Sequence, residues 1–351
     1  MREGVTIHDV ARRSNVSVST VSNWLNGRHE RMRSETSERI RRAITELKYS
    51  PNRVAQQLKT GHVPIIGLIV PSVANPFWGT FASSVEATAL ALGYQVLLCN
   101  GQRDLDRERR YAESLYSSGV RGIIFGSAMP SLEHLADLAA RGLQIIVFDR
   151  QMQDVDHFAS DSVAVDNLAG GRMAVDHLLA LGHRCIGFIS GPIRSVNRGD
   201  RLAGYAAALA AAGIELDQQL LWEGTAENTS ADMEGAEVGR AGAHALLALP
   251  QRPSALFAIN DMYALGAYAG ARDLGLRVPE DVSIVGFDDI LLAEIAEPPL
   301  TTIRQPIDEL MRVAVERLVA RIEGTRATAP EHFTLAAELV VRESTASIYG
   351  D

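Results

Sequence analysis

Short apolar runs alternate with longer amphipathic stretches over most of the chain after residue 62. Uninterrupted apolar runs of this length predict strands that are buried on both faces, as in parallel sheets. The amphipathic stretches between them predict helices, so the body is built from repeated strand–helix units. The predicted strands are Ile65–Val70, Gln95–Asn100, Gly122–Phe125, Ile145–Asp149, Cys185–Ser190, Ala255–Asn260 and Ile284–Asp288. The predicted helices include Ser83–Leu92, Arg107–Ser118, Asn167–Leu181 and Met262–Leu274.

The first 50 residues have a different pattern, which predicts three short helices. Thr6–Asp9 matches a capping box, in which a hydroxyl precedes a carboxylate by three residues, and Asn15 suits the end of this first helix. Ser17 can cap a second helix over Val18–Leu25, and a third is expected over Ser34–Leu47. Two helices joined by a short turn and supported by a third form a helix-turn-helix unit.

The second of these helices carries short polar side chains. Such side chains can reach both the phosphates and the base edges of DNA. Trp24 interrupts the polar pattern, and we interpret it as a packing residue beneath the helix. The outward polar residues are Ser17, Ser19, Thr20, Ser22 and Asn23.

Charge divides the chain at the same place as the hydrophobic pattern. The formal net charge is -9, but residues 1–62 hold 12 Lys and Arg against 6 Asp and Glu, a net of +6. Residues 63–351 hold 22 against 37, a net of -15. A small basic head on an acidic body indicates that the protein binds an anionic polymer, and that the head alone makes this contact. A basic face that is merely solvated is the alternative.

Several protein classes lack support in the sequence. Cys99 and Cys185 cannot make a disulfide framework, and we expect neither a transmembrane helix nor a signal peptide, so a cytoplasmic protein is the default. The glycine-rich phosphate-binding motifs and the common catalytic motifs are missing, and the histidines show no ligand spacing. We therefore expect no enzyme, no metal site and no cofactor.

Polar and aromatic residues follow the ends of the predicted strands, where open α/β sheets bind ligands. Carboxylates, amides and a guanidinium beside aromatic rings suit a polyhydroxylated ligand, of which a sugar is the simplest form. The alternative, that each Asp only caps the next helix, is natural for Asp161, Asp166 and Asp261. It is less natural for the set of Asp149, Arg201 and Asp288.

Two segments, TIHDVARRSNVSVSTVSNWLNG and YSPNRVAQQLKTG, resemble the DNA-binding head and hinge of the lac repressor family. The resemblance implies that the second helix enters the major groove, with Val18, Ser19 and Asn23 reading bases. It places Ser17, Thr20, Ser22 and Asn26 near phosphates. Family members often have Arg where this chain has Asn23, and Asn suits adenine rather than guanine. The DNA-binding set implied by the resemblance is completed by Thr6, Tyr49, Asn52, Ala55 and Leu58.

The segment from Asn52 to Leu58 is too short to be stable as an isolated helix. The resemblance implies that it folds on operator DNA and pairs with its mate across a dimer. Leu58 then wedges into the minor groove and kinks the duplex. A leucine of the protein core is the alternative, but the linker-like Lys59–Gly61 that follows favours the wedge.

The body resembles the same family through VPSVANPFW, VFDR, LGHRCIGFISGP, DRLAGY, AINDMYALGAY, VPEDVSIVGFDDI and PPLTTIRQP. The implied fold is a two-lobed, periplasmic-binding-protein-like α/β body with parallel sheets and three crossovers, and Asp161–Asp166 is a candidate crossover. The segment 224–239 is longer than usual for the family. The residues that match ligand-contact positions are Phe77, Asp149, Asn197, Arg201, Asn260 and Asp288.

This reading predicts a helix-turn-helix domain over 1–50, a hinge over 51–62, a ligand-binding domain over 63–343 and a short tail over 344–351. Lobe 1 is expected at about 63–161 and 291–323, and lobe 2 at about 162–290 and 324–343.

The function implied by the resemblance is that of a ligand-responsive regulator. We expect a repressor of carbohydrate-related genes that binds a palindromic operator as a homodimer and responds to a sugar or sugar derivative. A purine, a nucleoside or a protein co-effector are the alternatives within the family. A transport component would need a signal peptide and would not need the basic head. We expect the regulator to be cytoplasmic and to associate with the nucleoid.

Overall fold

The computed structural model describes residues 5–25, 32–49, 63–126, 129–150, 152, 154–224, 235–325 and 329–349. The chain divides into two compact units, Met1–Val63 and Pro64–Asp351. The smaller unit is helical and the larger one is α/β, so the predicted fold class is confirmed.

Three helices form the smaller unit: α1 (Ile7–Ser14), α2 (Val18–Leu25) and α3 (Ser34–Leu47). The bounds predicted for the second and third helices are those of the structure. The Asp9 carboxylate accepts hydrogen bonds from the backbone N–H and the hydroxyl of Thr6, at 3.0 and 2.7 Å. Asn15 adopts the left-handed conformation with φ 51°, and it ends α1 as predicted.

A small apolar core holds these helices together. It consists of buried residues from each helix, and Trp24 packs against it while its indole N–H donates to the Ser37 hydroxyl at 2.7 Å. Trp24 thus links α2 to α3, as the packing interpretation predicts. The buried core residues are Val10, Ala11, Val21, Ile40 and Ala43.

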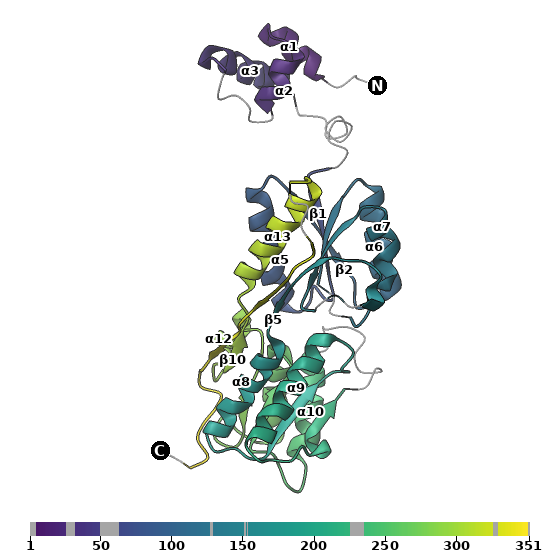
Figure 1. Cartoon of the computed structure of the whole chain (residues 1–351). Coiled ribbons are helices and arrows are strands. Elements are labelled where there is room, and N and C mark those ends of the chain that lie inside the picture. The colour runs from purple at the N-terminus through teal and green to yellow at the C-terminus, as the bar shows by residue number, and fades with distance from the viewer. Residues whose placement is uncertain are drawn as a thin grey trace. The chain divides into compact units, whose positions relative to one another are not determined.

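The first lobe of the larger unit contains a six-stranded parallel sheet in the order β11-β5-β4-β3-β1-β2. Figure 1 shows helices α5 (Pro76–Ala91) and α13 (Ile307–Ile322) on one face of this sheet, and α6 (Leu105–Ser117) and α7 (Ala136–Ala140) on the other. The strands are β1 (Ile65–Val70), β2 (Gln95–Asn100), β3 (Gly122–Phe125), β4 (Gln144–Phe148), β5 (Asp161–Val165) and β11 (His332–Leu335).

The second lobe contains a four-stranded parallel sheet in the order β7-β6-β8-β9. Helices α8 (Asn167–Ala180) and α9 (Val196–Ala211) pack together, and so do α10 (Gly235–Leu247) and α11 (Asp261–Asp273). The strands are β6 (Ile186–Ser190), β7 (Leu221–Glu223), β8 (Ala255–Ala258) and β9 (Ser283–Val285). Smaller elements are α12 (Leu291–Ile295), the antiparallel pair β10 (Thr302–Arg304) and β12 (Glu338–Val340), and the 3-10 turns Glu133–Leu135, Asp154–Asp156 and Gln218–Leu220.

The chain passes between the lobes after β5, again between β9 and α13, and again after β11. These connections are hydrogen-bonded to one another. The N–H of Asp166 donates to the Leu335 carbonyl at 3.0 Å, which joins the first and third connections. The pairing of β10 with β12 joins the second connection to the third. The three connections therefore form a joined hinge region beside both sheets.

Several bounds differ from those of the sequence analysis. Residues 161–165 and 332–335 form strands of the first sheet, whereas lobe 2 was expected to begin at 162 and to include 324–343. The helix expected at Ser83 begins earlier, at Pro76, because Asn75 caps it and proline is favoured in a first turn. In the part of the chain that the structure describes, no helix is long and apolar enough to cross a membrane.

Candidate ligand pocket and nucleic-acid interface

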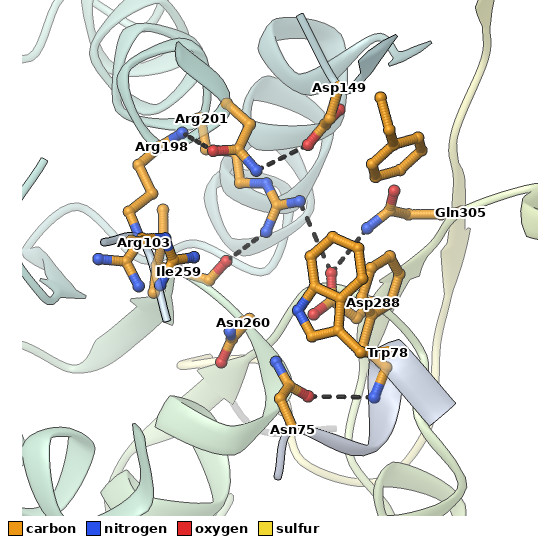
Figure 2. Close-up of a pocket in the computed structure, with 13 residues that line it drawn as sticks. Asn75, Trp78, Arg103, Asp149, Arg198, Arg201, Ile259, Asn260, Asp288 and Gln305 are labelled. Atoms are coloured by element: carbon orange, nitrogen blue, oxygen red, sulfur yellow. Dashed lines mark hydrogen bonds and ion pairs between the residues drawn. The ribbon is translucent and has the colours of Figure 1, made fainter. Parts of the chain in front are cut away.

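A pocket in the larger unit brings together residues from both lobes and from the hinge region (Figure 2). The empty space within it, part of which is open to solvent, is about 410 Å³. All six residues that the sequence analysis assigned to a ligand line it, although they are spread over more than 200 positions of the chain. They are Phe77, Asp149, Asn197, Arg201, Asn260 and Asp288.

Asp149 lies at the carboxyl end of β4 and is almost fully buried. Its backbone has a φ of 63°, and its N–H donates to the Val163 carbonyl at 2.8 Å. One carboxylate oxygen accepts from the Asn167 amide at 2.5 Å and the other from the Asn197 amide at 2.7 Å. Burial raises the pKa of this carboxyl, while Arg201 and the two amides oppose that rise.

Arg201 lies on α9 and joins three parts of the pocket. Its guanidinium donates to the Asn167 side chain at 2.8 Å and to the Ile259 carbonyl, at the end of β8, at 2.7 Å. It also lies 3.6 Å from the Asp288 carboxylate and stacks over the Phe287 ring at 3.5 Å from the ring centre. Burial lowers the pKa of Arg201, and Asp288 and Asp149 offset part of this effect. Arg201 therefore organises the walls of the pocket as well as lining it.

Asp288 and Gln305 belong to the hinge region and form another side of the pocket. Asp288 has a φ of 113°, which L-residues rarely adopt and which implies that surrounding contacts hold it. Its carboxylate accepts from the Gln305 amide nitrogen at 2.7 Å. The Gln305 carbonyl oxygen is buried, and among the described residues none donates a hydrogen bond to it. A ligand hydroxyl could supply the missing donor.

Aromatic rings make the apolar wall. Phe77 and Trp78, from the first turn of α5, meet edge to face with ring centres 5.0 Å apart. Phe148, at the end of β4, lies 6.1 Å from Trp78 and completes the wall. Rings in this arrangement can stack on the apolar face of a sugar or a base.

Two asparagines serve both as helix caps and as pocket residues. The side-chain oxygen of Asn75 accepts from the N–H of Phe77, and that of Asn260 accepts from the N–H of Tyr263, each at 3.1 Å. Capping fixes the orientation of both side chains. The amide nitrogens are then the groups that these residues can offer as donors in the pocket.

Four residues that line or support the pocket were missed by the sequence analysis. Asn167 bridges Asp149 and Arg201, and Arg103, Arg198 and Gln305 line the cavity. Arg103 follows the strand Gln95–Asn100, so applying the rule on strand ends to that strand would have found it. The others depend on how helices and crossovers pack, for which a single sequence carries no signal.

The three acids interpreted as helix caps have different roles. Asp166 does cap α8, by accepting from the N–H of Ala169 at 2.9 Å. The cap interpretation is wrong for Asp161, which starts a strand and is bound by both Arg317 and Arg321.

It is also wrong for Asp261. Its buried carboxylate accepts from the N–H of Ile290 at 2.9 Å and from the Thr302 hydroxyl at 2.5 Å, while Asn260 provides the cap of α11. Asp261 therefore ties α11 to the hinge region.

Of the eight described residues that were assigned to DNA, six lie on α2 or directly before it. Thr6, Ser17, Ser19 and Asn23 are exposed, whereas Val18, Thr20, Ser22 and Tyr49 are partly buried. Ser17 caps α2, since its hydroxyl accepts from the N–H of Thr20 at 3.1 Å. Asn26, Asn52, Ala55 and Leu58 lie outside the described residues, as does most of the 224–239 segment.

Val18 and Tyr49 also pack against the core of the smaller unit, so they have structural as well as predicted DNA-contact roles. Among the described residues, no group of three or more His, Cys, Asp or Glu side chains could hold a metal ion.

Comparison with known proteins supports both the helix-turn-helix unit and the two-lobed body. The family of bacterial regulatory proteins called lacI matches residues 6–52, and a periplasmic binding protein-like domain matches residues 175–345. The chain is 35% identical to the HTH-type transcriptional regulator DegA of Bacillus subtilis (strain 168) over 343 residues, which is 98% of each chain. It is 36% identical to the HTH-type transcriptional repressor PurR of Pectobacterium carotovorum subsp. carotovorum (strain PC1) over 323 residues, 92% of this chain and 91% of the relative.

A solved structure of the Lac repressor dimer, bound to operator and the anti-inducer ONPF, is similar over 98% of this chain and 100% of its own. The TM-score is 0.80 and the sequence identity 29%. These relatives are transcriptional regulators rather than enzymes. The chain therefore belongs to the lacI family of bacterial transcriptional regulators.

Proposed function

We propose that this regulator is a repressor that binds a palindromic operator as a homodimer and responds to a sugar or sugar derivative. The observation that carries the proposal is the convergence of six residues from both lobes on one pocket. A ligand in such a pocket contacts both lobes. Its binding therefore favours one arrangement of the lobes over the others. The repressor would act on the nucleoid, in the cytoplasm.

The chemistry of the pocket supports a polyhydroxylated effector. Asp149 and Asp288 provide carboxylate acceptors, Asn75 and Asn260 provide amide donors, and aromatic rings cover one side. Carboxylates and amides can each bind pairs of hydroxyl groups, and a ring can stack on a sugar face.

The DNA-binding half of the proposal rests on α2. Its exposed residues Ser19 and Asn23 are short polar side chains at the positions expected to meet base edges. One such helix contacts few base pairs, so two copies in a dimer are needed for specific binding. We assign DNA binding to 1–50, a hinge that includes Leu58 to 51–62, and ligand binding to 63–343.

The test uses the full chain and an operator selected from random duplexes. Ligands are found by thermal shift, because a compound that binds the folded state raises its melting temperature. We expect Arg201→Ala to abolish the effect of the ligand on operator affinity while basal DNA binding remains. Because Arg201 is buried, Asn197→Ala serves as a milder second variant, and Arg172→Gln, on the exposed side of α8, is the matched control.

An unchanged ligand response in both pocket variants would contradict the assignment of this pocket as the effector site. Failure to select any operator would contradict the proposal that the protein is a repressor.

A further inference from the structure

Residues 342–349 follow the strand β12 and run along the second lobe, where Figure 1 draws them in yellow. They form no helix or strand, yet hydrogen bonds tie them to the lobe along their length. The N–H of Ile284, in β9, donates to the carbonyl of the buried Ser344 at 2.9 Å, and the N–H of Ile348 donates to the Leu181 carbonyl at 3.1 Å. We call residues 342–349 the strap.

The first part of the strap is anchored to the hinge region. The Arg342 guanidinium donates to the Asp289 carboxylate at 2.6 Å, and the Ser344 hydroxyl accepts from the N–H of Thr301 at 2.7 Å. Asp289 directly follows Asp288, which lines the pocket. The strap therefore stabilises the connection that carries a pocket residue.

Two histidines of the second lobe hold the rest of the strap. His183 is 2% exposed, and its Nε2 lies 3.1 Å from the Ala346 carbonyl oxygen while its Nδ1 lies 2.8 Å from the Ser254 hydroxyl. The Nε2 of His177, in α8, lies 2.9 Å from the Thr345 hydroxyl. Both imidazole rings therefore contact the strap directly.

The contacts of His183 suit a neutral ring. A carbonyl oxygen can only accept, so the hydrogen bond to Ala346 requires a hydrogen on Nε2, and Nδ1 is then the acceptor for the Ser254 hydroxyl. A second proton would turn this acceptor into a donor and bring a charge into the lobe. Burial lowers the pKa of both histidines, and the nearby His177 adds to this effect on His183, although the Ala346 carbonyl opposes it.

Neighbouring acids do not offset such a charge. Among the residues that the structure describes, neither imidazole forms an ion pair with a carboxylate. Asp176 pairs with Arg172, and Asp281 pairs with Arg277. A proton taken up by either ring would therefore bring an unpaired positive charge into the lobe. The other charged or titratable side chains on the elements around the rings are Arg184, Cys185, Arg252, Glu280, Arg342, Glu343 and Tyr349.

We propose that proton uptake by His177 and His183 releases the strap from the second lobe and loosens the connection that carries Asp288. The strap is then a proton-sensitive support of the pocket. Its link to the effector rests on the proposed function, whereas its release by protons does not.

The direction of the pH dependence follows from the two histidines. In an open strap the rings meet water, where a histidine has a pKa of about 6.5. The closed strap binds fewer protons than the open one, because its histidines have lowered pKa values. The closed form is therefore fully favoured above about pH 6.5 and loses stability as the pH falls below that value.

Hydrogen–deuterium exchange of the full chain measures the opening of the strap. The amides to follow are those of Ala346 and Ile348, which are hydrogen-bonded to the lobe. Rates at about pH 5.5 and about pH 7.5 are corrected for intrinsic exchange. Each histidine that gains a proton on opening shifts the opening equilibrium by up to about tenfold over this range. We expect opening to be at least tenfold more frequent at the lower pH.

Substitutions assign this dependence to the histidines. The double variant His177→Gln and His183→Gln should make strap exchange independent of pH, because a glutamine amide can donate to the same oxygens but does not titrate. His177→Gln alone disturbs the less buried contact and should remove part of the dependence. His244→Gln, on α10, changes a histidine that pairs with Asp273 instead, and this matched control should keep the full dependence.

Equal protection of the strap at both pH values in the wild type, or a pH dependence that survives in the double variant, would overturn the proposal. The link to the pocket is tested with an effector found by thermal shift. Coupling between two sites is reciprocal, so a bound effector should reduce strap opening in the wild type. Equal opening with and without effector would contradict the link to Asp288. Failure to find any effector would count against the pocket, while the exchange data would still decide whether protons release the strap.

Discussion

Asp261 shows how a buried residue outside the pocket supports the pocket. Its carboxylate accepts hydrogen bonds from the N–H of Ile290 and from the Thr302 hydroxyl, and these contacts fix the loop that carries Asp288. Burial, and then the nearby charge of Asp288, raise the pKa of Asp261 well above its ordinary value. The folded state therefore keeps this proton where the unfolded chain has lost it, so its stability falls as the pH rises above about 4.

We expect Asp261→Asn to remove this dependence. The amide can accept from Ile290 and donate to the Thr302 oxygen, so both contacts are kept in a group that does not titrate. Urea unfolding at several pH values between about 4 and 8 should show the wild type losing stability relative to the variant as the pH rises. Parallel curves for the two proteins over this range would contradict the raised pKa.

The sequence alone located the pocket residues that follow strands or lie in recognisable motifs. Asp149 and Asp288 stand at strand ends, and Arg201 lies in DRLAGY, so all three could be named in advance. Asn167 could not, because its role depends on α8 and α9 lying close enough for one amide to reach both Asp149 and Arg201. Such contacts arise from packing between elements that the sequence pattern does not pair.

Among the elements, predictions succeeded where a strand contains a continuous run of apolar residues. The apolar runs at Ile65–Val70 and Gly122–Phe125 are strands with the predicted bounds. The strand β5 was missed because it begins with Asp161 and Ser162, which leaves only three apolar residues in a row. The strand β11 was missed because its side chains are partly exposed at the edge of the sheet. Both assignments depend on neighbouring strands rather than on local pattern.

The pairing of α8 with α9 depends on two glycines at their contact. A Cβ added at Gly204 would meet the carbonyl oxygen of Leu168, and one at Gly171 would meet that of Arg201. We expect Gly204→Ala to push the helices apart, lengthen the 2.8 Å contact between Asn167 and Arg201, and lower the free energy of unfolding by about 1–3 kcal/mol. Effector affinity should fall as well, because the same contact shapes the pocket.

Gly199→Ala is the matched control for this substitution. Gly199 lies on the same helix, and a Cβ there would have no neighbour within 4 Å among the described residues. Alanine is favoured over glycine in helices, so this variant should be as stable as the wild type or more stable by up to about 1 kcal/mol. Urea unfolding and ligand titration of both variants would contradict the role of the glycine contact if the two substitutions behaved alike.

At the scale of the whole molecule, opposite net charges mark the part proposed to bind DNA and the part proposed to bind the ligand. The head has a net charge of +6 and the body -15, so the body repels the DNA that the head attracts. DNA affinity should then depend on the release of counterions from phosphates that the head contacts. The base contacts that we propose for α2 would add specificity but release few ions.

This division predicts how salt acts on DNA binding. If a dimer contacts six or more phosphates, its affinity should fall by about a thousandfold or more between 50 and 200 mM salt. Asn23→Ala, which removes an exposed side chain expected to read a base, should weaken binding to the selected operator by about 1–3 kcal/mol without changing the salt slope. Fluorescence anisotropy with the operator and with a random duplex measures both effects. A flat salt dependence would contradict the assignment of the basic head to phosphates, and equal losses on both duplexes would contradict a base-reading role for Asn23.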